Sequence, residues 1–265
     1  MSLDNVRGLV IDLDGCIYLG KKPIEGAAEA IGKIRRAGYS ILFLTNNSTL
    51  TRGMYVRKLR GMGVEASEDE ILTSGVIAAR YIASQKPRAK VLPVAEAGFT
   101  EEARKLGIEI LDESRYHEAE YVTVGLDRTL TYRKLAAAVK AINMGACFIC
   151  TNLDHIYPGE EGFEPGAGAI AAAIEKASGV KPYSVGKPSE EANRQVFEAL
   201  KLSGRQVAFV GDRIDTDIKS AKMAGAVGVM VMTGAASLFN IDEAECKPDY
   251  VIESIVKLPE LLGVK

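Results

Sequence analysis

The feature that most constrains the fold is a recurring order of short apolar runs and helical patterns. Each apolar run stops abruptly at polar or glycine residues, and a segment with helical periodicity follows it. These runs lack the alternation of a strand with one wet face, so the predicted strands are buried on both faces. Strands that alternate with helices favour a parallel sheet covered by helices. We therefore predict an α/β fold with a doubly wound, Rossmann-like parallel-sheet core.

The elements expected in this core lie at the two ends of the chain. Several of the expected helices end at a glycine, which is a common helix stop. The expected strands are Gly8–Leu13, Ser40–Leu44, Glu70–Leu72, Val207–Val210, Val227–Met232 and Tyr250–Ile252. The expected helices are Ala27–Ala37, Arg52–Met62, Glu190–Leu200 and Ile214–Ala224.

A second set of α/β elements occupies the middle of the chain. The expected strands there are Lys90–Val94, Ile108–Leu111, Tyr121–Leu126 and Ala146–Cys150, and the expected helices are Thr100–Leu106, Tyr132–Asn143 and Gly166–Lys176. This is enough material for an independent domain. We therefore predict a discontinuous core of residues 1–86 and 182–265, interrupted by an inserted α/β domain of residues 87–181.

Composition and charge exclude several classes of protein. The 33 basic and 35 acidic residues give a formal charge of −2, without the basic footprint of a nucleic-acid binder. No cationic segment leads into an apolar one near the N-terminus, and no apolar stretch is long enough to span a bilayer, so we expect neither a signal peptide nor a membrane partner. Four cysteines are few for a disulfide scaffold and fit a reducing compartment, so we expect a cytoplasmic protein.

One cysteine pair, Cys147 and Cys150, has the spacing of a redox or zinc motif. It lies in a β-like run, where residues three apart point to opposite faces. No second pair is present for zinc, and no helix starts at the pair as a thioredoxin-like site requires. We interpret both as buried structural cysteines.

Polar clusters follow the predicted core strands, at the edge where open α/β sheets bind ligands. These clusters are Asp12-Leu13-Asp14-Gly15, Thr45-Asn46-Asn47-Ser48 and Gly211-Asp212-Arg213, with Thr216-Asp217 a turn later. Carboxylates that converge there repel one another unless a cation joins them. Oxygen ligands without a nearby histidine or cysteine favour Mg²⁺, which often also binds a substrate phosphate.

Two further features are suited to a phosphate group. The Thr45 hydroxyl and the amides of the turn through Asn47 offer hydrogen-bond donors to phosphate oxygens. Lys187, in Gly186-Lys187-Pro188, precedes a predicted helix and offers a positive charge to both carboxylate and phosphate. The sequence therefore predicts a site for a divalent cation and a phosphorylated ligand.

The chain resembles the phosphatases of the haloacid dehalogenase superfamily along its whole length. Asp12-Leu13-Asp14-Gly15, Thr45-Asn46-Asn47-Ser48, Gly186-Lys187-Pro188 and Gly211-Asp212-Arg213 with Thr216-Asp217 are similar to the four motifs of that family, in its order. Thr-Asn-Asn after the second strand, with a large insertion before the lysine, resembles the NagD and p-nitrophenyl phosphatase branch. The resemblance implies that residues 87–181 form a C2-type cap.

The resemblance also implies a role for each motif residue. Asp12 would be the nucleophile that forms an aspartyl-phosphate, and Asp14 the general acid and then the general base. Lys187 would stabilise developing charge. Thr45, Asn46 and Asn47 would bind the phosphoryl group. Mg²⁺ would be held by Asp12, Asp212 and the backbone carbonyl of Asp14, and Asp217 would orient the metal's surroundings.

Cys16 departs from the family pattern, which often has threonine or valine at this position. Cysteine is close to both in size, so we expect the geometry of the motif to survive. The thiol also offers a point at which oxidation would affect the site.

The selection of the substrate is expected to involve the loop after the last strand of the inserted domain. Asn152, Asp154 and His155 lie there, although a polar loop built on a local Asx turn explains them equally well. Tyr18 and Leu19, just after the first motif, are candidates for a place under the cap. A large cap favours a small phosphorylated metabolite over a phosphoprotein.

Two other features are interpreted as structural. Gly166-Ala167-Gly168-Ala169-Ile170-Ala171 matches a dinucleotide-binding pattern, but Gly162–Pro165 before it is not an apolar strand. His117 lies among charged residues and is expected to be exposed.

The sequence thus predicts a Mg²⁺-dependent phosphatase that hydrolyses a small phosphate monoester through an aspartyl-phosphate. Two alternatives stay open: a phosphotransferase or mutase on the same core, and a non-catalytic protein that binds phosphorylated ligands. The leaving group is undetermined among phosphoglycolate, sugar phosphates, nucleotides and pyridoxal phosphate. Because related caps often pair, we also expect a homodimer.

Overall fold

The computed structural model describes residues 1–159, 162–238, 241 and 243–264, and its chain folds into two compact units. We call them the core unit and the inserted unit. The core unit comprises Met1–Thr45, Gly53–Leu72 and Lys187–Lys265. The inserted unit comprises Asn46–Arg52 and Thr73–Gly186.

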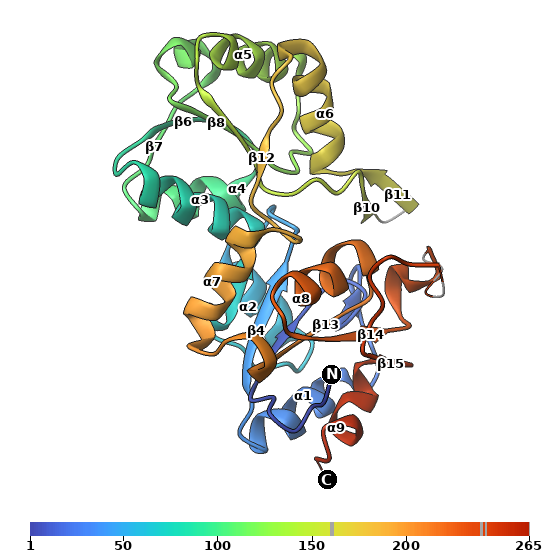
Figure 1. Ribbon diagram of the computed structural model, residues 1–265. Coiled ribbons are helices and arrows are strands. Elements are labelled where there is room, and N and C mark those ends of the chain that lie inside the picture. Colours follow the sequence, from blue (N-terminus) through green and yellow to red (C-terminus); the bar gives the residue numbers. More distant parts are fainter. Residues whose placement is uncertain (160–161, 239–240, 242, 265) are drawn as a thin grey trace. The chain divides into compact units, whose positions relative to one another are not determined.

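The core unit contains a sheet of six strands among the described residues, in the order β15-β14-β13-β1-β4-β5. These strands are β1 (Gly8–Ile11), β4 (Ser40–Thr45), β5 (Ile71–Thr73), β13 (Val207–Gly211), β14 (Val227–Val231) and β15 (Tyr250–Ile252). The pairings of β1 with β4 and β13, of β13 with β14 and of β14 with β15 are parallel. Figure 1 shows the blue and orange-red ends of the chain side by side in this sheet. The predicted parallel core is confirmed.

The strand order reverses beside β1. From β1 the chain moves outward through β4 to β5, whereas from β13 it moves in the other direction through β14 to β15. Because the crossovers of parallel strands are right-handed, helices of the two halves cover opposite faces of the sheet. Loops at such a switch point diverge and leave room for a ligand at the carboxyl ends of the strands. Asp12 follows β1 and Asp212 follows β13, so both lie at this point.

Helices flank the core strands much as the periodicity predicts. They are α1 (Ala27–Arg36), α2 (Arg52–Gly61), α7 (Glu190–Leu200), α8 (Lys219–Met223) and α9 (Leu258–Leu261). Short 3-10 segments cover Glu68–Glu70, Gly204–Gln206, Gly234–Leu238 and Ile255–Lys257, and a small hairpin joins β2 (Tyr18–Leu19) to β3 (Lys22–Pro23).

The segment predicted as one helix over 214–224 differs from that expectation. It begins as a wide π-helical turn, Ile214–Ile218, and only then continues as α8. The carbonyl of Arg213 accepts hydrogen bonds from the amides of both Asp217 (3.0 Å) and Ile218 (3.2 Å), which widens the turn. Functional sites often carry such a turn, and here it contains Asp217.

The inserted unit has its own parallel sheet, in the order β12-β9-β8-β6-β7. Its strands are β6 (Lys90–Val94), β7 (Glu109–Ile110), β8 (Tyr121–Val124), β9 (Cys147–Cys150) and β12 (Tyr183–Ser184). Its helices are α3 (Ser74–Gln85), α4 (Ala97–Lys105), α5 (Tyr132–Asn143) and α6 (Ala167–Ser178), with a 3-10 segment at Glu113–Glu118. An apolar core of this unit includes Val122, Val124 and Ala138.

The division between the units differs from the predicted boundaries of residues 87 and 181. Helix α3, expected within the core segment 1–86, belongs to the inserted unit. It packs closely on α4, because a Cβ atom on Gly75 would lie only 2.9 Å from the carbonyl oxygen of Gly98. The segment Asn46–Arg52 also belongs to the inserted unit.

One of two local interpretations needs correction. Gly162–Pro165, expected not to be an apolar strand, is the exposed strand β11, which pairs antiparallel with β10 (Ile156–Gly159). Its described residues are exposed, so the buried parallel strand of a dinucleotide site is still missing before α6. Cys150 is buried as expected, but Cys147 is exposed, because alternation along β9 turns it to the other face. All four cysteines are free.

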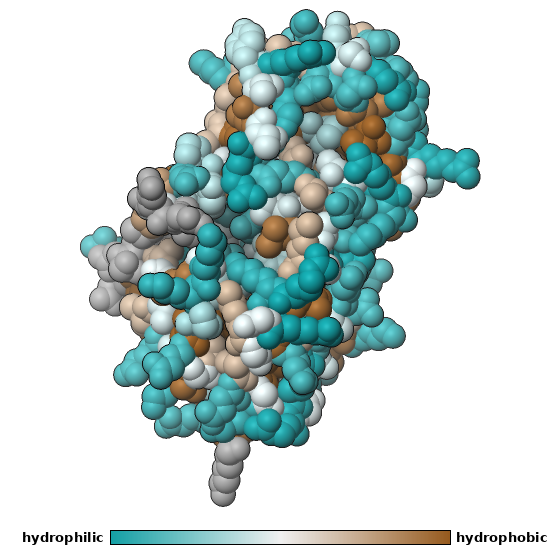
Figure 2. All heavy atoms as spheres, turned by 180° about the vertical axis from the view of Figure 1, so that it is seen from behind, coloured by the Kyte–Doolittle hydropathy of each residue, from teal (hydrophilic) through white to brown (hydrophobic). Residues whose placement is uncertain are grey.

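Figure 2 shows a face on which hydrophilic residues predominate and hydrophobic residues are scattered. Among the helices of the described residues, none is both long and apolar enough to cross a membrane.

Candidate active site

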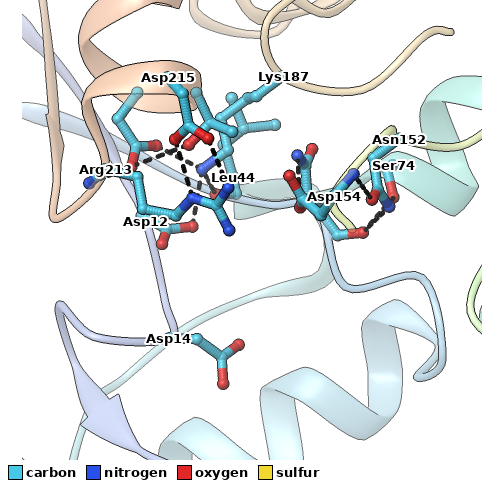
Figure 3. A network of polar contacts seen from close by, with 12 residues as sticks. Asp12, Asp14, Leu44, Ser74, Asn152, Asp154, Lys187, Arg213 and Asp215 are labelled. Carbon is cyan, nitrogen blue, oxygen red and sulfur yellow. Dashed lines mark hydrogen bonds and ion pairs between the residues drawn. The ribbon is translucent and has the colours of Figure 1, made fainter. Parts of the chain in front are cut away.

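The centre of the candidate site is the buried side chain of Lys187. Its Nζ atom donates to Oδ1 of Asp12 at 2.7 Å, to Oδ1 of Asp217 at 2.6 Å and to the carbonyl oxygen of Leu44 at 3.0 Å. Figure 3 shows these contacts converging on the ammonium group. Lys187 stands just before α7, so the start of one core helix joins the ends of β1 and β4 to the turn after β13.

Three carboxylates meet beside this lysine. Asp12, Asp212 and Asp217 each offer an oxygen, and these oxygens lie within 4.8 Å of one another. Their exposed fractions are only 8%, 3% and 2%. The structure thus brings together four residues that the sequence predicted to share a site.

The geometry of this cluster fits a divalent cation. Oδ1 of Asp212 is buried and has no hydrogen-bond partner in the part of the chain that the structure describes. A buried carboxylate oxygen without a partner destabilises the folded state unless a cation or a proton binds it. The donors are all hard oxygen atoms, the set that Mg²⁺ prefers. Asp12, Asp212 and Asp217 are therefore suited to hold it.

The backbone around Asp212 is shaped to receive its carboxylate. Oδ2 of Asp212 accepts a hydrogen bond from the amide of Ala235 at 2.5 Å. A Cβ atom on Gly15 or on Gly234 would lie 2.2 Å from the same oxygen. Thr233 ties the two loops together, since its hydroxyl donates to the carbonyl oxygen of Gly15 at 2.5 Å. Glycine is thus required on both sides of this carboxylate.

The ionisation of the cluster reflects its burial. Burial raises the pKa of Asp12 well above its ordinary value, and the carboxylates of Asp217 and Asp212 add to that rise against the attraction of Lys187. Burial and the Asp217 carboxylate raise the pKa of Asp212 to about 7. Burial alone would lower the pKa of Lys187, but Asp12 and Asp217 outweigh it and raise it. The lysine is therefore charged, and the carboxylates favour a second positive partner.

Asp14 lies apart from this cluster, as Figure 3 shows. Its Oδ2 atom accepts a hydrogen bond from the hydroxyl of Tyr18 at 3.1 Å. Burial raises the pKa of Asp14, while the Lys58 ammonium and the Tyr18 hydroxyl oppose that rise. Tyr18 is fully buried in the core unit and Leu19 is 52% exposed.

The phosphate-binding residues predicted after β4 are divided between the two units. Thr45 is buried at the end of β4 in the core unit. Asn46 and Asn47 follow it directly but belong to the inserted unit. In the inserted unit Asn46 lies beside Gly186, the residue before Lys187, because a Cβ atom on Gly186 would lie 2.7 Å from Oδ1 of Asn46.

Within the inserted unit, the loop after β9 holds Asn46. The Asn152 side chain donates to the carbonyl oxygen of Asn46 at 2.7 Å, and Ser74 donates to the same oxygen at 2.6 Å. The Asn46 side chain donates to Oδ2 of Asp154 at 3.0 Å. Asn152 also accepts from the Asp154 amide at 3.1 Å, which is the local Asx turn named as the alternative. His155 is exposed.

Sequence reasoning missed several residues that shape the site. Lys58 places its Nζ atom 3.4 Å from the ring centre of Tyr18. Asp215 binds the guanidinium of Arg213 at 3.0 and 2.7 Å, and the Arg213 amide donates to Asp217 at 3.3 Å. Gly234, which lies against Asp212, follows β14 and belongs to none of the four motifs. The position of Gly234 after a core strand was the available signal.

The chain is similar to known proteins over nearly its whole length. Residues 9–109 match the model of haloacid dehalogenase-like hydrolases, and residues 184–258 match a second model of HAD-hydrolase-like proteins. An acid sugar phosphatase of Staphylococcus haemolyticus (strain JCSC1435) is 36% identical over 260 residues, which covers 98% of each chain.

Solved structures of phosphatases share the fold over nearly the whole chain. A p-nitrophenyl phosphatase from Archaeoglobus fulgidus is 39% identical with a TM-score of 0.90, covering 96% of this chain and 98% of that one. A glycerol phosphate phosphatase from Mycobacterium tuberculosis, solved in complex with magnesium, is 30% identical with a TM-score of 0.89, covering 98% of this chain and 77% of that one. The chain therefore belongs to the haloacid dehalogenase-like hydrolase family and is a phosphatase of its NagD and p-nitrophenyl phosphatase branch.

Proposed function

We propose that this protein is a Mg²⁺-dependent phosphatase that hydrolyses a small sugar phosphate or a similar alkyl phosphate, with Asp12 as the nucleophile. The observation that carries the proposal is the buried cluster in which Lys187 binds Asp12 and Asp217 next to Asp212. A carboxylate in such surroundings is held at a fixed position and is shielded from an approaching phosphate dianion by positive charge.

In the first step Asp12 attacks phosphorus. Lys187 binds Oδ1 of Asp12 and so leaves Oδ2 for the attack. The new bond joins an Asp12 oxygen to phosphorus, and the bond between phosphorus and the alcohol oxygen breaks. Asp14 donates its proton to that leaving oxygen, so the product leaves as a neutral alcohol. The enzyme is then an aspartyl-phosphate.

In the second step Asp14 acts as a base. Its carboxylate takes a proton from water as the water oxygen attacks phosphorus, and the bond between Asp12 and phosphorus breaks. Inorganic phosphate is released, and both aspartates return to their starting states. Lys187 remains hydrogen-bonded to Asp12 through both steps.

The residues around Asp12 are suited to bind Mg²⁺ and phosphate together. Asp12, Asp212 and Asp217 would hold the cation, with the backbone carbonyl of Asp14 as a further oxygen ligand. When bound, the cation would offset the negative charge of the phosphoryl oxygens. Thr45, at the end of β4, would donate a hydrogen bond to the same oxygens, and the same role for Asn46 and Asn47 stays a prediction from the family resemblance.

The names of the relatives support the substrate class. Two staphylococcal relatives are named acid sugar phosphatases, and one solved relative is named a glycerol phosphate phosphatase. Both names describe esters of phosphate with a small polyol. Asn152, Asp154 and His155 stay candidates for recognition of the leaving group, and a homodimer and a cytoplasmic location stay predictions.

Phosphate release from p-nitrophenyl phosphate and from a panel of sugar phosphates tests the proposal. Activity should require Mg²⁺, disappear in EDTA and fall by at least about 10³-fold in Asp12→Asn. Asp4→Asn is the control, since Asp4 is exposed and its carboxylate accepts a hydrogen bond from the nearby Ser2 hydroxyl. An Asp12→Asn variant as active as the wild type would overturn the nucleophile.

The same assay separates the remaining alternatives. A phosphotransferase or mutase would pass the phosphoryl group to a competing alcohol such as glycerol, and the phosphorylated acceptor would exceed free phosphate. A non-catalytic binding protein would bind the phosphorylated ligand without releasing phosphate. We expect free phosphate as the main product.

A further inference from the structure

The turn that carries Asp14 folds back so that Tyr18 lies beside it. The amide of Gly15 donates to the carbonyl oxygen of Tyr18 at 2.8 Å, and Asp14 and Tyr18 form an isolated β-bridge. Gly15 has a φ of +83°, which favours glycine and permits the sharp reversal. The backbone therefore presents the Tyr18 side chain to Asp14.

The Tyr18 ring is fixed from the other side by helix α2. Tyr18 is fully buried, and the Lys58 Nζ atom lies 3.4 Å from its ring centre. This is a cation–π distance, and the half-buried position of Lys58 strengthens the contact. The Tyr18 hydroxyl, which donates to Oδ2 of Asp14 at 3.1 Å, is thus held by a rigid ring.

We propose that Tyr18 and Lys58 are positioning residues that aim the Asp14 carboxyl group at the leaving oxygen of the substrate. The inference rests on the proposed function and adds two residues that lie outside the four motifs. Tyr18 binds Oδ2 of Asp14, so Oδ1 is the oxygen that carries the proton. A hydrogen bond to Oδ2 is compatible with both the acid and the carboxylate, so the contact serves both steps.

The place of Asp14 agrees with this role. In phosphoryl transfer the attacking and leaving oxygens stand roughly in line on opposite sides of phosphorus. An acid that serves the leaving oxygen must therefore stand apart from the attacking carboxylate, with space for a phosphoryl group between them. Figure 3 shows the Asp14 side chain apart from Asp12 and its partners, as this role requires.

The dependence of activity on the leaving group distinguishes a positioning role from a purely structural one. An alkoxide is strongly basic and needs a proton as it leaves, whereas nitrophenolate is weakly basic and needs little help. The value of kcat/KM reports the steps through phosphorylation of the enzyme. Tyr18→Phe removes only the hydroxyl and keeps the ring under Lys58.

We expect Tyr18→Phe to lower kcat/KM for glycerol phosphate by about 10- to 100-fold, the value of a hydrogen bond to a charged group. The kcat/KM for p-nitrophenyl phosphate should change by less than about 3-fold. Lys58→Met should lower kcat/KM for glycerol phosphate by about 3- to 10-fold, again with little effect on p-nitrophenyl phosphate. Lys58→Arg, which keeps the positive charge over the ring, should retain the wild-type activity. Tyr250→Phe is the matched control, because its hydroxyl donates to the Met1 carbonyl oxygen at 2.7 Å.

A double-mutant cycle completes the test. Tyr18 acts through Asp14, so Tyr18→Phe should have no further effect on glycerol phosphate in an Asp14→Asn background. Equal losses on both substrates, unchanged activity on both, or additive losses in the double variant would each overturn the inference. The proposed function fails separately, if the wild-type enzyme releases no phosphate from either substrate in Mg²⁺.

Discussion

The Nζ atom of Lys187 lies 2.7 Å from Oδ1 of Asp12, although 175 positions separate the two residues in the chain. Both side chains are buried: without Lys187, Asp12 loses the cation that it pairs with, and without Asp12, Lys187 loses one of two carboxylates that it contacts. The contact therefore joins the two chain segments of the core unit on either side of the insertion. This contact affects both the stability of the core unit and catalysis.

Removal of the lysine should damage both properties. Lys187→Met would leave Asp12 and Asp217 without their shared cation, so we expect the metal-free protein to lose about 3–5 kcal/mol of its free energy of unfolding. The kcat/KM for p-nitrophenyl phosphate should fall by about 10²-fold or more. Urea unfolding in EDTA and steady-state kinetics measure the two effects. Lys222→Met, which breaks a half-exposed pair with Asp249, is the control and should cost less than about 1 kcal/mol.

The metal-free protein should become less stable as pH rises towards neutrality. The pKa of Asp212 is raised from 3.8 to about 7, so the folded protein binds more protons than the unfolded chain in this window. Its free energy of unfolding therefore falls as pH rises from 3.8 to about 7, and the raised pKa of Asp12 acts in the same direction.

Mg²⁺ competes with these protons, so it should raise the melting temperature more at about pH 7.5 than at about pH 5. Thermal melts in EDTA and in Mg²⁺ at both pH values measure the difference. Asp212→Asn should remove most of it. Equal Mg²⁺ effects at the two pH values would contradict the assignment of Asp212 as a ligand.

Gly15→Ala should disable the site without unfolding the core. The new Cβ atom would lie 2.2 Å from Oδ2 of Asp212, and the φ of +83° would strain any other residue. We expect weaker Mg²⁺ binding and a fall in kcat/KM of about 10²-fold, measured by Mg²⁺ titration of activity. Gly20→Ala isolates the backbone strain, because Gly20 has a φ of +60° and nothing within 4 Å of the added atom. Similar losses in both variants would show that strain, not the contact with Asp212, is responsible.

In the loop after β9, we expect Asn152 to contribute to stability and the exposed His155 not to. Asn152→Ala removes a buried donor to the carbonyl oxygen of Asn46, which Ser74 still satisfies, so we expect a loss of about 1–2 kcal/mol. His155→Ala should change stability by less than about 0.5 kcal/mol. If His155 contacts the leaving group, this variant should change KM unequally across a panel of sugar phosphates. Thermal melts and that panel test both statements, and a destabilised His155→Ala protein would contradict them.

Some elements were predictable to the residue because local signals agree. Helix α7 has the predicted bounds Glu190–Leu200, since Ser189 caps it by accepting from the Ala192 amide and its apolar residues recur at helical spacing. Helix α3 was missed for the opposite reason. All residues from Ser74 to Ala79 are buried, so the first half of the helix has no polar stripe. It also follows β5 without a turn, and the cap at Thr73 is the signal that marks its start.

The amino-acid sequence by itself determined the six strands of the parallel core, and it marked Asp12, Lys187, Asp212 and Asp217 as residues of one site. Periodicity reports which faces of an element are buried, and ligands bind at the carboxyl ends of parallel strands. The tertiary structure decided which distant groups meet at that edge of the sheet: Lys187 lies between Asp12 and Asp217, and Gly234 lies against Asp212. It also turned Tyr18 back onto Asp14 beneath Lys58. Such contacts depend on how separate elements pack, and the local sequence around a residue does not indicate which distant residue it will contact.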